Sequence, residues 1–233
     1  MKKKILCMTL VVFVGMLSGC GTEDKEIQQG DNTTLENKVL ENTVPENKET
    51  YDSSDGLPPV EPEMKQFYKE AEELFKDIVF LRLDCDDQQS KIEATDDEDV
   101  QVLYYKVTDE RFPTMENLKE ELGKYFTEQF TEELVSELMW NQPRFREYDG
   151  ELYMIQASRS GNIQYAGHVF EAVESDGDTM KMPVKVYYAL NATPYEYFYE
   201  YPEDLDAYEV KEYTQIMVKE GGQWKFSQFE LFY

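Results

Sequence analysis

The sequence predicts an α+β domain in which three N-terminal helices pack on an antiparallel sheet of about five or six strands. Two observations support this class. Apolar residues recur at helical spacing in three segments of the first half of the domain. The second half is rich in β-branched and aromatic residues and contains three turn signals of the kind that join antiparallel strands: Asp149-Gly150, Asp176-Gly177 and Gly221-Gly222. Helices gathered on one face of such a sheet define an α+β domain.

Each predicted helix combines an apolar stripe with a start signal. The first starts near Glu61, with Pro62 in its first turn, where a missing N–H costs nothing. Thr114 and Thr127 are the expected N-caps of the second and third helices, and Pro143 should mark the end of the third. The apolar stripes are Met64, Phe67, Ala71, Leu74, Phe75 and Ile78, then Leu118, Leu122 and Phe126, then Phe130, Leu134, Leu138 and Met139.

The strands are expected mainly after the helices. Residues 102–107 form one strand between the first two helices, whereas the acidic stretch 84–99 reads as a loop around at most a short strand. Three hairpins then follow, with strands over 145–148 and 152–156, 168–174 and 180–190, and 208–219 and 223–232. This order resembles the cystatin-like or NTF2-like superfamily, and that resemblance implies a curved sheet wrapped around a helix.

The first 20 residues are typical of a bacterial lipoprotein export signal. Lys2, Lys3 and Lys4 precede an apolar run of about 13 residues, which is shorter than the about 20 that a membrane-spanning helix needs. Leu17-Ser18-Gly19-Cys20 resembles the lipobox, in which the Cys is lipidated and the chain is cut before it. We therefore expect residues 1–19 to be a signal peptide. Cys20 would anchor the chain to the outer face of the cell membrane.

Residues 20–61 are predicted to be a disordered acidic tether. They contain 11 acidic residues, three Lys and a single aromatic residue, Tyr51, too little apolar surface to offset the entropy of ordering. The domain itself is expected over residues 62–233.

Charge argues against nucleic-acid binding. The signal contains three of the 23 Lys and Arg residues and none of the 49 Asp and Glu residues, so the mature chain has a formal net charge of −29. Such a chain repels phosphates, so its attachment to an anionic membrane would depend on the lipid. It favours basic partners, although solubility alone also explains an acidic surface.

Little in the sequence points to catalysis or to a cofactor. Cys85 is the one Cys left after processing and reads as a small buried hydrophobe, and His168, the only His, as a residue at a strand start or in a loop. The acidic groups could offer oxygen ligands to calcium, but they lack the EF-hand spacing and also suit surface loops. These groups are Asp84, Asp86 and Asp87, the run 96–99, and Ser175-Asp176-Gly177-Asp178. Glu147, Asp149 and Glu151 crowd a hairpin tip, which is a poor place to raise a carboxyl pKa.

Four tyrosines alternate along one short segment and are the predicted partner-binding residues: Tyr195, Tyr197, Tyr199 and Tyr201. In an extended strand all four side chains would point the same way. A rigid tyrosine face suits a protein interface, although it could equally pack on a sheet or against the core. Pro194 and Pro202 bracket the segment, which favours an edge strand or a long loop.

Two longer segments resemble a known family. They are residues 105–112, Tyr-Lys-Val-Thr-Asp-Glu-Arg-Phe, with Leu118 and Phe126-Thr127-Glu128 after them, and residues 145–153, Phe-Arg-Glu-Tyr-Asp-Gly-Glu-Leu-Tyr, followed by 157–161. Together they resemble Firmicute proteins of the IseA-type DL-endopeptidase inhibitors over about residues 64–233. The resemblance implies a non-enzymatic protein that binds the catalytic domain of an NlpC/P60-type peptidoglycan hydrolase and blocks its substrate groove.

The sequence is also compatible with two other functions. A cone-shaped pocket in the sheet would favour a small-ligand-binding module. A flat tyrosine-rich patch without such a pocket would fit either an inhibitor or an envelope scaffold lipoprotein.

Overall fold

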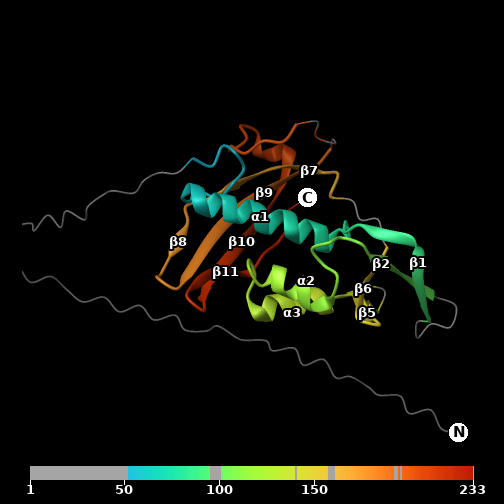
Figure 1. Ribbon diagram of the computed structural model, residues 1–233. Coiled ribbons are helices and arrows are strands. Elements are labelled where there is room, and N and C mark those ends of the chain that lie inside the picture. Colours follow the sequence, from blue (N-terminus) through green and yellow to red (C-terminus); the bar gives the residue numbers. More distant parts are fainter. Residues whose placement is uncertain are drawn as a thin grey trace, which may run out of the picture. The chain divides into compact units, whose positions relative to one another are not determined.

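Three α-helices and two main antiparallel sheets make up the part of the chain that the computed structural model describes, which is residues 52–94, 101–139, 141–156, 161–191, 194 and 196–232 (Figure 1). These residues belong to one unit of the chain, Lys48–Tyr233. The predicted signal peptide, Cys20 and the tether before Asp52 lie outside the described residues. No helix within the described ranges is long and apolar enough to cross a membrane.

The helices are α1 (Pro62–Val79), α2 (Met115–Leu122), α3 (Glu128–Ser136) and a short 3-10 helix, η1 (Leu205–Ala207). The strands are β1 (Cys85–Ala94), β2 (Gln101–Val107), β3 (Leu138–Met139), β4 (Gln142–Pro143), β5 (Phe145–Tyr148), β6 (Glu151–Ile155), β7 (Tyr165–Phe170), β8 (Glu174–Ser175), β9 (Thr179–Ala189), β10 (Tyr208–Glu220) and β11 (Gln223–Gln228).

Helix α1 follows its predicted apolar stripe and lies across the five-stranded sheet (Figure 1). Pro62 lies in the first turn, as predicted. The Tyr68 ring meets Phe170 of β7 at 5.7 Å and Phe226 of β11 at 5.9 Å, both edge to face. The Phe75 ring meets Phe126, between α2 and α3, at 5.8 Å. The buried stripe of α1 therefore joins the sheet and the other helices in one core.

Both predicted threonine caps are confirmed. The Thr114 hydroxyl accepts a hydrogen bond from the Asn117 N–H at 3.2 Å, and the Thr127 hydroxyl accepts one from the Phe130 N–H at 3.3 Å. The predicted end of the third helix is wrong, because α3 stops at Ser136. The next apolar residues, Leu138 and Met139, form strand β3.

The predicted single sheet is also wrong, although the α+β class is confirmed. The strands form a four-stranded sheet in the order β1-β2-β6-β5 and a five-stranded sheet in the order β11-β10-β9-β7, with β8 paired to β9. The helices are not all N-terminal either, because β1 and β2 precede α2. This arrangement differs from the one curved sheet that the cystatin/NTF2-like resemblance implies.

Strand β1 is longer than expected, because the stretch 84–99 was predicted to hold at most a short strand, whereas β1 has ten residues. Most of its residues are exposed, because β1 lies at the edge of the four-stranded sheet and pairs only with β2. An exposed edge strand has no need for the apolar alternation that reveals a half-buried strand. The hairpin at Asp149-Gly150 is confirmed, and both residues have positive φ, 54° and 80°, as a tight two-residue turn requires.

The residues before α1 pack on the domain. Leu57 and Val60 are buried, and Leu57 belongs to the hydrophobic core. The Lys65 ammonium forms an ion pair with Asp55 at 3.0 Å. The predicted tether, residues 20–61, thus overlaps a packed segment, residues 52–60, which we call the junction segment. The earlier part of the tether stays a prediction.

Candidate functional site

The segment that carries the four tyrosines docks on the free edge of β7 through Phe198. The Phe198 N–H donates to the Ala166 carbonyl and the His168 N–H donates to the Phe198 carbonyl, each at 3.1 Å. Its ring packs against Tyr187 at 5.4 Å and Tyr208 at 5.3 Å. We call residues 196–202 the tyrosine loop.

This close docking depends on a glycine in β7. A Cβ atom added to Gly167 would lie 2.0 Å from the Phe198 carbonyl oxygen, a separation that no real contact allows. A side chain at position 167 would therefore push the tyrosine loop away from the sheet edge. A glycine inside an otherwise regular strand often marks such a close backbone approach.

Tyr199 is held between the junction segment and β7. Its ring meets the His168 imidazole edge to face at 5.2 Å. On its other side it covers Gly56, where an added Cβ would lie 2.7 Å from two ring carbons. Gly56 also has a φ of +74°, a conformation that favours glycine. Tyr199 thus supports the loop, and its position requires a residue without a Cβ atom at position 56.

His168 joins three parts of the chain. Its Nε2 donates to the Gly56 carbonyl at 2.7 Å, and its Nδ1 lies 2.6 Å from the Tyr165 hydroxyl, which can donate to it. Burial lowers the pKa of His168, and this effect outweighs the opposing influence of the Gly56 carbonyl and of Glu72. The ring is therefore neutral at pH 7, and both of its nitrogens are occupied.

His168 also corrects an expectation, since it lies inside β7, as the fourth residue of Tyr165–Phe170, and not at a strand start or in a loop. Its partners, Gly56 and Tyr199, lie far away in the sequence. No local pattern connects these residues, and Gly167 was the one signal in the sequence that could have indicated the docking.

The three described tyrosines of this segment, Tyr197, Tyr199 and Tyr201, contact different residues of the sheet edge. Tyr197 is exposed and its ring meets Tyr165 at 5.0 Å. Tyr201 contacts the opposite side of the sheet edge, with its ring 5.9 Å from the Lys185 ammonium and its hydroxyl 3.4 Å from Glu171. Of the two alternatives that the prolines favoured, an edge strand or a long loop, the structure has the loop, and within its described residues only Phe198 bridges to the sheet. Tyr195 lies outside the described residues.

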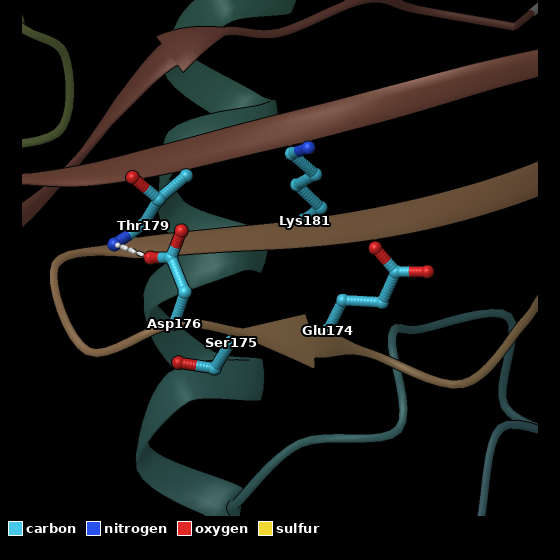
Figure 2. A pocket seen from close by; sticks show the side chains of 5 residues that line it. All are labelled: Glu174, Ser175, Asp176, Thr179 and Lys181. Atoms are coloured by element: carbon cyan, nitrogen blue, oxygen red, sulfur yellow. Dashed lines mark hydrogen bonds between the residues drawn. The ribbon is translucent and has the colours of Figure 1, made fainter.

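The acidic groups considered for calcium lie only partly within the described residues. Across the described ranges, no group of three or more His, Cys, Asp or Glu side chains could hold a metal ion. The run 96–99 lies outside them. Asp176 instead accepts a hydrogen bond from the Thr179 N–H at 3.1 Å and stabilises the β8–β9 turn (Figure 2).

A small pocket of about 120 Å³ lies beside that turn, lined by Glu174, Ser175, Asp176, Thr179 and Lys181 (Figure 2). It is smaller than the about 300 Å³ at which pockets begin to bury drug-sized ligands. Its lining is polar, and the Glu174 and Lys181 side chains come from paired positions of neighbouring strands. This pocket therefore offers little support for a small-ligand-binding module.

The remaining candidate groups are Cys85 and the carboxylates at the tip of the β5–β6 hairpin. Cys85 is half-buried at the start of β1, and burial, reinforced by the Asp84 charge, raises its pKa to about 11. Its thiol is therefore protonated at neutral pH and a poor nucleophile. Glu151 forms an ion pair with Lys106 at 2.6 Å, while Glu147 and Asp149 are exposed.

The described site thus presents exposed apolar and acidic side chains on a loop held by packing, which is the chemistry of a protein-binding surface. The model of a known family, the IseA DL-endopeptidase inhibitor, matches residues 60–231 of the chain. The protein belongs to this family, as the resemblance of its sequence segments predicted. A comparison with curated proteins gave no match.

Proposed function

We propose that this protein is a lipid-anchored, extracytoplasmic inhibitor of an NlpC/P60-type DL-endopeptidase, and that the tyrosine loop contacts the hydrolase. Membership of an endopeptidase-inhibitor family supports the class of partner. One observation supports the tyrosine loop as the contact surface. Phe198 and Tyr199 dock on the domain and hold the loop, while Tyr197 stays exposed. A loop ordered before binding loses less entropy on association.

The surroundings of the titratable groups support a non-enzymatic role. The two nitrogens of His168, the only His in the sequence, are both taken up by fold contacts. The pKa of Cys85 is raised, which opposes formation of the nucleophilic thiolate. The inhibitor would then act by occupying the hydrolase, without chemistry of its own.

The test is the hydrolysis of purified cell walls by a DL-endopeptidase catalytic domain, followed as loss of turbidity. The added protein is the mature chain with Cys20→Ser, so that it stays free of lipid. We expect inhibition that rises with its concentration. A wall amidase, which cuts a different bond, serves as control and should keep its full rate. No inhibition of several DL-endopeptidases at a large molar excess would overturn the proposal and favour an envelope scaffold.

Anchoring needs a separate experiment. Cells that express the protein are grown with labelled palmitate, and the protein is recovered from the membrane fraction. We expect label in the wild type and none in Cys20→Ser. Labelled Cys20→Ser protein would contradict the proposed anchor.

A further inference from the structure

Exposed apolar side chains gather at one end of the five-stranded sheet, where β7 begins, β9 ends and β10 begins. They are Ile163, 71% exposed, Tyr197, 60%, Leu205, 55%, and Leu190, 49%. Single exposed apolar side chains are ordinary, whereas several that lie together are typical of an interaction site.

Backbone hydrogen bonds bring these residues' loops together. The Ala189 N–H donates to the Gln164 carbonyl at 2.8 Å, so the residues next to them, Ile163 and Leu190, leave the sheet at the same place. The Leu190 N–H donates to the Ala207 carbonyl at 3.1 Å, which brings η1 and its Leu205 beside β9. Tyr197 joins them through its ring contact with Tyr165.

The stretch of sequence that contains Leu190, Tyr197 and Leu205 is acidic. No Lys or Arg occurs in the sequence between Lys185 and Lys211, and this stretch contains six acids: Glu196, Glu200, Glu203, Asp204, Asp206 and Glu209. All six are exposed. Of these six acids, all of them within the described part of the chain, only Glu209 forms an ion pair, with Lys211 at 3.5 Å. Of the other five, Asp204 caps η1 by accepting a hydrogen bond from the Asp206 N–H at 3.2 Å. The exposed carboxylates of this stretch can thus face a basic partner.

We propose that Ile163, Leu190, Tyr197 and Leu205, with their acidic rim, form the contact surface for a basic protein surface that is apolar at its centre. We call these four residues the apolar patch. An apolar centre supplies most of the affinity of such an interface, while charges at the rim set its association rate and its orientation. The inference rests on the proposed function in taking a DL-endopeptidase as the partner. It assigns contact to the apolar patch and support to Tyr199.

The acidic rim also selects against other partners. Nucleic acids and anionic lipid surfaces would be repelled by these carboxylates. A basic protein gains from each rim carboxylate that it neutralises, and the gain falls as salt screens the charges. Salt dependence therefore distinguishes the rim from the apolar patch.

The experiment compares matched variants in the wall-hydrolysis assay. The patch variants Ile163→Ser and Leu205→Ser each remove one apolar side chain from the apolar patch. The control variants Ile92→Ser and Leu138→Ser remove side chains of similar exposure, 64% and 58%, from other elements. Each patch variant should raise the inhibition constant about tenfold, which is the cost of losing a central contact. Both controls should inhibit like the wild type. Equal inhibition by all four variants would overturn the inference.

Charge reversal tests the rim. Glu200→Lys/Glu203→Lys is compared with Glu110→Lys/Glu120→Lys, which makes the same change in net charge at exposed acids elsewhere. At low salt the rim variant should associate with the hydrolase about tenfold more slowly than the control variant, and the difference should disappear at 1 M salt. Equal slowing in both variants would mean that only net charge matters, and would overturn the role of the rim.

These outcomes separate the two proposals. A wild-type protein that inhibits, with patch and control variants alike, leaves the proposed function standing and refutes the surface. A wild-type protein that neither binds nor inhibits any DL-endopeptidase refutes the proposed function. It also refutes the inference that a DL-endopeptidase binds the apolar patch.

Discussion

His168 donates a hydrogen bond from Nε2 to the carbonyl of Gly56 at 2.7 Å, and so links the edge strand β7 to the junction segment 112 residues earlier in the chain. Tyr199 packs on both residues. The junction segment, the edge strand and the tyrosine loop therefore meet at one point. We expect changes at this point to alter the loop even where they leave the rest of the core intact.

Gly56→Ala tests this junction against a glycine of similar backbone conformation. Gly56 and Gly222 have φ of 74° and 84°, so Ala is strained at both, but only at position 56 would its Cβ meet a side chain, Tyr199 at 2.7 Å. We expect Gly56→Ala to lower the free energy of unfolding by about 1–3 kcal/mol more than Gly222→Ala, as overpacking does. Urea denaturation measures the difference.

The double variant Gly56→Ala/Tyr199→Ala serves as the control for this clash. Removing the ring should make the Ala at position 56 about as costly as the Ala at position 222. If Gly56→Ala and Gly222→Ala were equally stable, Tyr199 would not be packed on Gly56.

Gly167→Ala should release the tyrosine loop from β7. Its Cβ would meet the Phe198 carbonyl oxygen at 2.0 Å, and a backbone atom cannot move aside without breaking the two hydrogen bonds at Phe198. Amide hydrogen exchange of Phe198 should then become fast. Gly177→Ala, with no atom near its Cβ, is the control and should leave this amide protected. Unchanged exchange in Gly167→Ala would contradict the docking.

The pH dependence of stability should contain a contribution from His168. Burial lowers its pKa in the folded protein below the ordinary value of 6.5, so between these two pKa values the unfolded chain binds more protons. The contribution of His168 to stability is complete above pH 6.5, falls as the pH drops below 6.5, and stops falling at the pKa of the folded protein. The Gly56 carbonyl and the charge of Glu72 oppose this lowering of the pKa but do not cancel it, and the rings of Tyr165, Tyr199 and Phe170 surround the imidazole.

His168→Gln isolates this contribution, because Gln can donate to Gly56 but does not titrate in this range. Urea unfolding at pH 7.5 and pH 5.5 should show a larger loss for the wild type than for His168→Gln. An equal loss in both proteins would assign the pH dependence to the carboxylates alone.

Cys85 should react slowly with alkylating reagents. Its pKa of about 11 leaves little thiolate at pH 8, whereas an ordinary Cys has a pKa near 8.5. We expect iodoacetamide to modify Cys85 in the folded mature chain with Cys20→Ser at least tenfold more slowly than in the same chain unfolded in urea. Equal rates in the two states would contradict the buried environment of the thiol.

The sequence predicts those parts of the fold that local patterns encode. Thr114 and Thr127 cap helices because their hydroxyls bond to N–H groups three residues later, and Asp149-Gly150 turns because both residues accept positive φ. The length of strand β1 was underestimated because its exposed edge has no alternation of apolar residues.

The candidate site was predicted in part. All four tyrosines were predicted to bind a partner, and this role stays a prediction. The structure shows Tyr197 exposed, whereas Tyr199 packs against His168 and Gly56. The supports of the loop, Gly56, Gly167 and His168, act through contacts between residues far apart in the sequence. Such contacts depend on the tertiary fold and leave no periodic trace in one sequence.

Hydrogen exchange of the mature chain, with and without a DL-endopeptidase catalytic domain, tests the central claim most directly. We predict that the bound hydrolase slows exchange at residues 161–164 and 196–210, at the end of the five-stranded sheet, and leaves the four-stranded sheet unchanged. Slower exchange confined to the four-stranded sheet, or no change at saturating hydrolase, would contradict the proposed binding surface.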